Sequence, residues 1–272
     1  MVANLVTPAA EAAAPEIPVR TLSASDLNLS LREGWKDFLS MRGDLIFVGL
    51  LYPLIGTVTA AVTLGWDLWQ LFFPIAAGIS LMGPLVAVGF YELARREEAG
   101  LHSNWSHFFD FVKRPSADGL GAVAALLVLI FGLWMAAAQA LFAALWGMTA
   151  PDSIGAFLTR LFTTTEGWTL IVAGNLIGAV FAVLVLAISF VSLPMLVDCN
   201  VEARTAVDTS IRAFRENKWL MIRWGLTVGF LLVLGSIPLF IGLAVVLPWL
   251  GYATWHLYTH VVDREGLEIC QD

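Results

Sequence analysis

Two histidines near the end of the last apolar segment have the spacing of a ligand pair. His256 and His260 are four residues apart, so a helix places both rings on one face. Such a pair can bind a metal ion or provide an axial haem ligand. Because no carboxylate or thiol follows at a fixed spacing, we interpret both as interfacial histidines that form hydrogen bonds with lipid headgroups. A haem or metal redox enzyme is therefore the least favoured function.

The chain has 2 cysteines, Cys199 and Cys270. They form no C-x-x-C motif or other metal-binding spacing. The charge distribution described below places both on the cytoplasmic side, where thiols stay reduced. We therefore expect two free, unpaired thiols, and we expect neither a metal nor another cofactor.

Polar residues inside the apolar segments are few. A charge at mid-membrane depth is costly and would be the strongest functional signal. Glu92 and Asp198, however, lie near segment ends, where they can reach water. Gln139 and Asn175 lie deeper and are uncharged. We expect Asn175 to hydrogen-bond to a neighbouring helix, and the lining of a polar pathway is the alternative.

Prolines and small residues indicate where helices bend or meet. Pro84 and Pro194 lie inside apolar segments, and each removes one backbone hydrogen bond of a helix. The freed carbonyl groups need partners in lipid, so these kinks should face other helices or a cavity. Two glycine pairs have the spacing that lets helices approach closely, and we expect them to form helix-packing seams: Gly174 with Gly178, and Gly225 with Gly229.

Signatures of catalysis and of nucleic-acid binding are missing from the sequence. It contains no Ser-His-Asp set, phosphate-binding glycine loop, H-E-x-x-H motif or basic nucleic-acid patch. We therefore expect the chain to be neither an enzyme nor a nucleic-acid-binding protein.

Long apolar runs must position these residues. Of the 272 residues, 58% are hydrophobic and 14% are charged, whereas about a quarter are charged in a soluble domain. A membrane-spanning helix needs roughly 20 apolar residues. The last run is too long for one span, and Ser236-Ile237-Pro238 can break it. The predicted fold is an all-α polytopic membrane helix bundle of six transmembrane helices with in-plane amphipathic helices. The spans are expected at about residues 45–64, 71–93, 120–146, 169–196 and in the two halves of 219–258.

The basic residues predict the orientation of the bundle. Of the 15 Lys and Arg residues, 14 lie on the same side of the predicted spans, and Arg160 is the exception. Because loops rich in Lys and Arg stay in the cytoplasm, we predict an inner-membrane protein with both termini cytoplasmic. A five-span topology, with the C-terminus outside, is the alternative. Residues 1–29 are expected to be a disordered cytoplasmic tail, 30–262 the transmembrane domain and 263–272 a cytoplasmic C-terminal tail.

Short amphipathic segments flank the spans. Apolar residues recur at helical spacing in four of them, at about residues 31–39, 105–112, 154–162 and 203–214. Asn104 is expected to cap the second. Such helices lie in the membrane plane with the apolar face inward, and docking onto the bundle or onto a partner is the alternative. Trp134 lies in mid-span and is expected to pack against another helix.

Five short motifs resemble those of a known family. Gly34-Trp35-Lys36-Asp37 stands before the first span, and the run from Gly83 to Glu92 lies in the second; three more follow in order, at residues 178–182, 189–194 and 254–258. Together they are similar to a bacterial integral membrane family called domain of unknown function 2189, over about residues 30–262. The resemblance implies six spans and supplies no activity.

We therefore expect a non-enzymatic accessory, assembly or organising factor. Its partners would be the lipid bilayer and either other inner-membrane proteins or a second copy of the chain. A transporter or channel for a small neutral or apolar solute is the alternative, favoured by the kinked helices, Asn175, Gln139 and a faint internal repeat.

Overall fold

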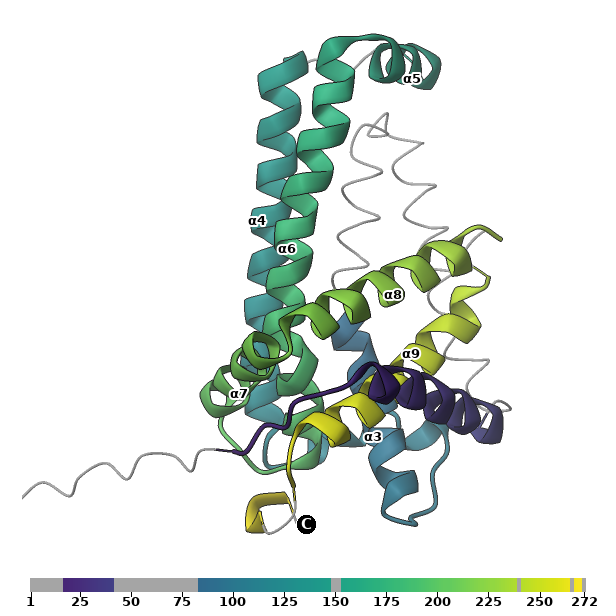
Figure 1. The fold of residues 1–272 in the computed structure, drawn as a ribbon, viewed down its shortest axis with the longest axis vertical. Helices are drawn as coiled ribbons and strands as arrows, with labels where there is room; N and C mark the ends of the chain where they lie inside the picture. The colour runs from purple at the N-terminus through teal and green to yellow at the C-terminus, as the bar shows by residue number, and fades with distance from the viewer. Residues whose placement is uncertain (1–16, 42–82, 148–152, 239–240, 265–266, 271–272) are drawn as a thin grey trace, which may run out of the picture.

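The structure is a computed structural model that describes residues 17–41, 83–147, 153–238, 241–264 and 267–270 (Figure 1). The predicted first span and most of the second lie outside these residues. Within them every regular element is a helix, which confirms the all-α class. After a helix over residues 24–41 come α3 (Gly83–Glu98), η2 (Trp105–His107), η3 (Asp110–Lys113), α4 (Ala117–Trp146), α5 (Ile154–Thr163), α6 (Thr165–Asp198), α7 (Ala203–Glu216), α8 (Lys218–Ser236), α9 (Leu243–Val261) and η4 (Glu268–Cys270).

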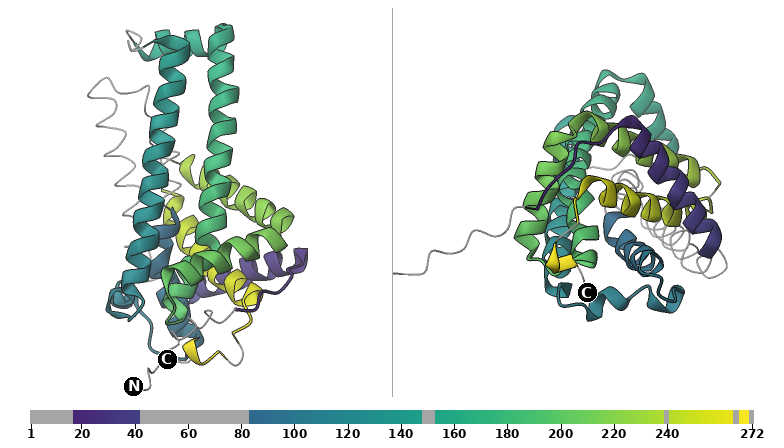
Figure 2. Two further views of the ribbon diagram at one scale, coloured as in Figure 1. Left: turned by 90° about the vertical axis from the view of Figure 1, so that its left-hand side faces the viewer. Right: turned by 60° about the horizontal axis from the view of Figure 1, so that its bottom comes forward.

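A long hairpin of α4 and α6 forms the tallest part of the molecule (Figures 1 and 2). These helices contain the predicted spans 120–146 and 169–196, with 30 and 34 residues. At 1.5 Å per residue they are about 45 and 51 Å long, which exceeds the hydrocarbon thickness of about 30 Å. Together with α8, they are the three described helices that are long and apolar enough to cross a membrane.

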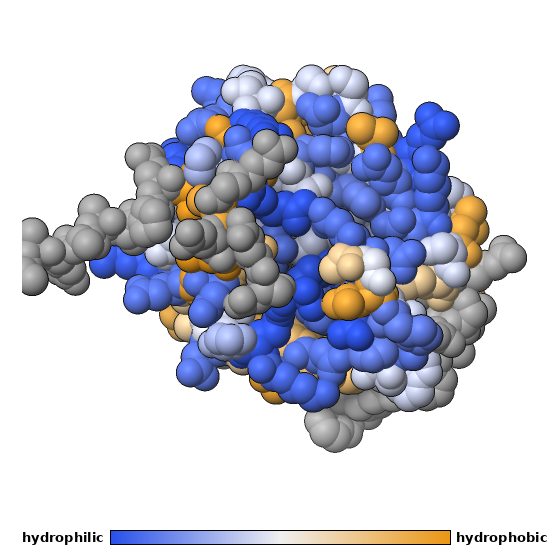
Figure 3. All heavy atoms as spheres, turned by 90° about the horizontal axis from the view of Figure 1, so that it is seen from below, coloured by the Kyte–Doolittle hydropathy of each residue, from blue (hydrophilic) through white to orange (hydrophobic). Residues whose placement is uncertain are grey.

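The exposure of α6 changes abruptly along its length. Large apolar side chains are exposed from Trp168 to Leu184, as expected where a helix faces lipid. From Ile188 to Asp198 every residue is buried against other helices. The molecule thus has a membrane layer, around the upper part of α6, and a lower layer that is packed like a soluble core. Seen from below, the lower layer presents a largely hydrophilic face (Figure 3).

Trp134 fixes the contact between α4 and α6. Its indole is buried and packs against Phe181 with ring centroids 5.7 Å apart. Gly178 faces the same indole, and a Cβ at this position would lie 3.0 Å from it. This is the helix contact expected for Trp134.

The predicted break in the last apolar run is confirmed. The first helix, α8, ends at Ser236, and α9 begins at Leu243. Both helices slant relative to α4 and α6, and their described ends stop short of the level of α5 (Figures 1 and 2). The described residues therefore do not establish six transmembrane helices: α8 has the length and composition of a span, and α9 does not meet the same criterion.

The amphipathic segments differ in what they contact. The buried face of α7 consists of Ala206, Thr209, Ser210 and Ala213, and it docks on α6 rather than lying free in the membrane plane. Asn104 caps η2 as predicted, because its side chain accepts a hydrogen bond from the Ser106 backbone. The segment that follows forms two 3₁₀ turns, not one regular helix.

The two ends of the described chain lie side by side. The backbone N–H of Arg20 donates to Val261 at 2.7 Å, and that of Asp263 donates to Pro18 at 3.1 Å. An ion pair of 2.8 Å joins the side chains of Arg20 and Asp263. Residues 17–29, expected to belong to a disordered tail, are thus held against the body. Two segments in contact lie on one side of the membrane, which argues against the five-span topology.

A pair of alanine substitutions tests the packing of α4 on α6. Gly178→Ala should lower the free energy of unfolding by at least about 1 kcal/mol, because the buried Trp134 ring has no room to move away. Gly174→Ala on the same helix is the control, since its Cβ would make an ordinary contact of 3.8 Å with Leu141. Unfolding by SDS in mixed micelles measures both. Equal stability of the two variants would contradict this packing.

Candidate functional site

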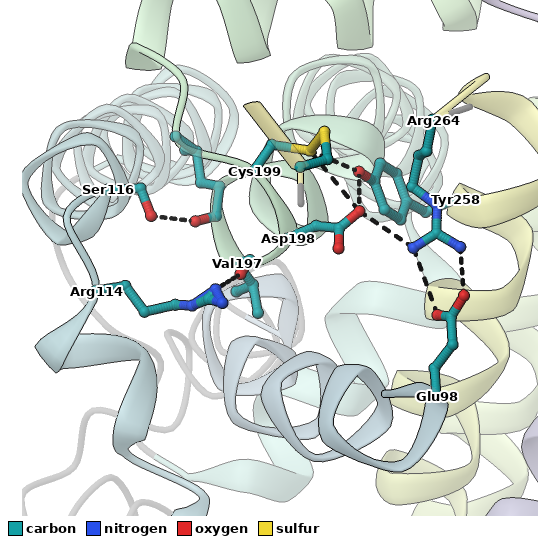
Figure 4. Close-up of a disulfide and its surroundings, with 10 residues drawn as sticks. Glu98, Arg114, Ser116, Val197, Asp198, Cys199, Tyr258 and Arg264 are labelled. Atoms are coloured by element: carbon teal, nitrogen blue, oxygen red, sulfur yellow. Dashed lines mark hydrogen bonds and ion pairs between the residues drawn. A yellow bond between two sulfur atoms is a disulfide. The ribbon is translucent and has the colours of Figure 1, made fainter. Parts of the chain in front are cut away.

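At the lower end of α6, charged and polar side chains from several separate parts of the chain lie together (Figure 4). We call this group the polar junction, and it consists of Glu92, Glu98, Arg114, Ser116, Asp198, Cys199, Tyr258, Arg264 and Cys270. They come from α3, from the loop before α4, from α6, from α9 and from the segment after α9.

The first task of the polar junction is to complete α6. The last carbonyl groups of a helix have no partner within the helix. Here the Ser116 hydroxyl donates to the carbonyl of Leu196, and the Arg114 guanidinium donates to that of Val197 at 2.6 Å. A cation at this position also complements the negative end of the helix dipole.

Arg114 is in turn balanced by a buried carboxylate. Its Nε lies 3.7 Å from Glu92 Oε2. The other partner of Glu92 is Arg95, whose guanidinium donates to both carboxylate oxygens at 2.8 and 3.1 Å. Glu92 therefore connects α3 to the loop that caps α6.

Asp198, the last residue of α6, is the centre of a second ionic group. Its Oδ2 accepts hydrogen bonds from the Tyr258 hydroxyl at 2.8 Å and from Arg264 at 3.2 Å. Arg264 also pairs with Glu98, and Glu98 accepts a hydrogen bond from the Trp255 indole at 2.9 Å. Burial lowers the pKa of Arg264, but its hydrogen bond to Glu98 and the charge of Asp198 raise that pKa above its usual value. The guanidinium is therefore a permanent cation between two carboxylates.

The two cysteines form a disulfide, so the expectation of two free thiols is wrong. Cys199 and Cys270 are 71 residues apart in sequence, and their sulfur atoms are 2.03 Å apart. The backbone N–H of Asn200 also donates to the carbonyl of Ile269 at 2.8 Å. The expectation was based only on the cellular compartment, because the sequence does not show that α6 ends beside the segment after α9.

The disulfide lies next to Asp198. The carboxylate oxygen and the two sulfur atoms lie within 4.8 Å of one another, a spacing that suits a metal ion when all three are free. In the disulfide neither sulfur is a thiolate, which is the form that binds metal. Asp198 Oδ2 is also engaged by Tyr258 and Arg264. In this state the three residues fasten chain segments together.

The two histidines hold the helix of residues 24–41 against α9. His256 Nε2 hydrogen-bonds with Asp37 Oδ2 at 2.6 Å, and His260 Nδ1 hydrogen-bonds with Ser30 Oγ at 3.2 Å. Glu33 lies between them, 3.6 Å from His256 and 4.0 Å from His260. The partners of the two side chains are therefore protein groups, and not the lipid headgroups expected from the sequence.

Close backbone approach strengthens the same contact. A Cβ on Gly34 would lie 2.4 Å from the backbone nitrogen of Ala253, so only glycine fits there. Trp35 packs edge-on against Trp249 with centroids 5.1 Å apart. The motifs at residues 34–37 and 254–258, which are far apart in sequence, therefore contact each other.

Other predicted residues lie in the membrane layer or deep in the lower one. Asn175 is exposed, and its amide donates to Ile171 of its own helix at 2.8 Å, whereas among the described residues no neighbouring helix provides it with a hydrogen bond. Gln139 is half-buried on α4. Pro194 is buried among fully packed neighbours, and Pro84 lies in the first described turn of α3.

The glycines of α8 differ from each other. A Cβ on Gly225 would lie 3.0 Å from Leu186 of α6, whereas one on Gly229 would meet no described atom within 4 Å. A seam between α6 and α8 is therefore seen at the first position and not at the second.

The polar junction contains residues that the sequence motifs did not single out. Arg114, Arg264, Glu98 and the disulfide were not candidates, although Tyr258 closes the motif at residues 254–258. The isolated Arg264, just after the last apolar run, was the one available signal. A lone cation there can pair with an acid at another span end.

Comparison with known proteins supports the family resemblance. Residues 72–198 match the family described as "Predicted integral membrane protein (DUF2189)". The motifs at residues 34–37 and 254–258 lie outside this match. No curated protein and no solved structure matches the chain.

A double-mutant cycle tests the ionic group around Asp198. Arg264→Met should lower the free energy of unfolding by about 3 kcal/mol, because it leaves the buried carboxylate of Asp198 without its cation. Adding Asp198→Asn should restore part of that loss. Arg204→Met is the control: its pair with Asp208 is 90% and 70% exposed, so it should cost less than about 0.5 kcal/mol. Equal losses for Arg264→Met and Arg204→Met would contradict the buried ionic group.

Gly34→Ala should release the helix of residues 24–41 from α9, because the added methyl group collides with backbone that has no alternative position. Hydrogen exchange of the chain in nanodiscs measures the release as faster exchange over residues 24–41. Gly229→Ala, at an open position, should leave that exchange unchanged. Unaltered protection in Gly34→Ala would show that the two helices do not meet there.

Proposed function

Because residues 72–198 match the integral membrane family called domain of unknown function 2189, we propose that the chain is a non-enzymatic organising protein of the bacterial inner membrane. It holds a rigid platform on the cytoplasmic side of the bilayer, on which other proteins assemble. The termini and the polar junction belong to this platform.

One observation carries the proposal: an apolar surface on the lower layer. Leu101, Trp105, Phe109 and Val112 are all exposed, and the last two are 63% and 61% exposed. We call this surface the aromatic face. Exposed apolar patches rimmed by polar residues are typical of protein-binding sites, and Arg96, Asp110 and Lys113 lie around this one.

The depth of the aromatic face favours a protein partner over lipid. Its segment continues directly into Arg114, which binds the carbonyl of Val197. Lipid-type exposure on α6 ends near Leu184. Val197 is about 20 Å further along the helix axis at 1.5 Å per residue, whereas headgroups add only about 5–8 Å per leaflet.

The rigidity of the platform also supports an organising role. Phe108 packs edge-on against Phe90, with centroids 5.1 Å apart, and its ring occupies the space beside Gly89. This anchors the aromatic face on α3. A preordered apolar surface loses little conformational entropy when it binds.

The transport alternative gains less support. Two of its four sequence indications are Asn175 and the proline kinks. Asn175 faces outward and bonds within α6, and Pro194 is in the packed lower layer. Neither places a polar group at the centre of the described membrane layer.

Site-specific photo-crosslinking tests the proposal. A photoreactive phenylalanine analogue at Phe109 should give a discrete protein adduct in native membranes, and the same analogue at lipid-exposed Val180 should give only lipid adducts. The captured protein, once purified, should bind the wild-type chain in nanodiscs. It should bind Trp105→Ala/Val112→Ser at least tenfold more weakly. Lipid adducts alone at Phe109, or equal binding of the variant, would refute the proposal.

A further inference from the structure

We propose that Cys199 and Cys270 form a reversible thiol–disulfide modification site, which fastens the segment of residues 267–270 over the end of α6 and releases it. The inference goes beyond the organising role. It depends on the cytoplasmic placement of the lower layer, which is part of the proposed function.

The segment has few attachments besides the disulfide. It forms one hydrogen bond with the other described elements, in which the backbone N–H of Asn200 donates to the carbonyl of Ile269. The other backbone bonds, from Leu267 to Arg264 and from Cys270 to Leu267, lie within the segment and its approach. Leu267 and Ile269 add partial apolar packing. The disulfide therefore determines whether residues 267–270 remain attached to the end of α6.

The two cysteine residues differ in exposure. Cys199 is 2% exposed, whereas Cys270 is half-buried. An incoming thiolate can reach Cys270 first, which leaves Cys199 as the departing sulfur. This difference sets the order of the exchange steps.

The polar junction accommodates both redox states. Cys199 Sγ lies 3.7 Å from Asp198 Oδ2 and 3.6 Å from the Tyr258 hydroxyl (Figure 4). After reduction, the Cys199 thiol has a carboxylate at hand to accept its weak hydrogen bond. Arg264 remains beside Asp198 and holds the carboxylate in place. The buried thiol of Cys199 therefore has a hydrogen-bond acceptor after reduction.

The charge distribution explains why the bond should be reversible. In the topology predicted from the sequence, 14 of the 15 Lys and Arg residues, all but Arg160, lie on the side of the polar junction, which is the pattern of a cytoplasmic face. Cytoplasmic thiols are kept reduced, and disulfides there are transient. A buried pair already aligned for bonding on that face should respond to oxidants.

The exchange is balanced with a dithiol reductant. One reductant thiolate attacks Cys270 Sγ, and a mixed disulfide forms while the Cys199–Cys270 bond breaks. Cys199 leaves as a thiolate and takes up a proton. The second thiolate of the reductant then attacks the mixed disulfide and frees Cys270, which is also protonated. Two electrons and two protons pass to the protein, and the reductant becomes a disulfide. Oxidation by a small-molecule disulfide is the reverse.

Thiol trapping of the full chain in its native cells tests the site. Cells are quenched with acid and N-ethylmaleimide, and the disulfide-bonded fraction is then reduced and labelled with a heavy maleimide. We expect mostly free thiols in unstressed cells, at least a fivefold increase in the disulfide fraction after diamide, and reversal by dithiothreitol. A disulfide that resists dithiothreitol in the folded chain, or thiols that stay free in diamide, would overturn the proposal.

Hydrogen exchange in nanodiscs tests the release of the segment. The Asn200 amide should exchange at least tenfold faster after reduction. In Cys270→Ser it should exchange fast with or without reductant. Equal exchange in both redox states of the wild-type chain would overturn the fastening role.

An impermeant maleimide added to intact cells tests the cytoplasmic placement of the lower layer separately from the redox response of the cysteines. With Cys199→Ala, the remaining Cys270 should stay unlabelled until the cells are opened. Labelling from outside would refute the cytoplasmic placement, and with it the reversibility. If Cys270 is not labelled from outside and the thiols also fail to respond to diamide, the modification site would be refuted, and the organising role would be unaffected.

Discussion

The lower end of α6 is the constraint on which the rest of the structure depends. A helix of 34 residues is longer than the hydrocarbon is thick, so its last turns leave the lipid. They end inside packed protein, where each backbone carbonyl group and the carboxylate of Asp198 need a partner. Those partners come from the loop before α4, from α9 and from the segment after it. The packing of the lower layer follows from this requirement.

Ser210 shows how one neighbour satisfies the backbone of α6 above its end. Its hydroxyl donates to the carbonyl of Ala187 at 2.8 Å and accepts from the N–H of Val191 at 3.1 Å. A side chain inserted into a helix ladder is a recognised cause of bending. The position lies near the boundary between the two layers, so α7 is docked where α6 passes out of the lipid.

Much of the architecture could be predicted from the sequence because the bilayer imposes simple rules. Apolar length predicted α4 and α6, the Ser236-Ile237-Pro238 break predicted the end of α8, and Asn104 predicted a cap. The polar junction could not be predicted in the same way. Arg264 and Asp198 are 66 residues apart, and no local pattern indicates that two distant segments meet.

The errors have a common physical cause. Asn175 looked like a group that needs an interhelical partner, but its own helix offered a carbonyl oxygen four residues earlier. The cysteines were expected to be free thiols because their predicted cytoplasmic location was the only basis for the prediction. In each case the local property was read correctly, and the partner was set by the fold.

The boundary between lipid and water along α6 is the most direct test of this account. With the native cysteines oxidised, nitroxides are placed one at a time at Val172, Val180 and Asn200, which are exposed positions, and power saturation compares oxygen with a water-soluble nickel reagent. The account predicts oxygen-dominated relaxation at Val172 and Val180 and free access of the nickel reagent at Asn200. Exclusion of the nickel reagent from Asn200 would place the polar junction within the hydrocarbon and contradict it.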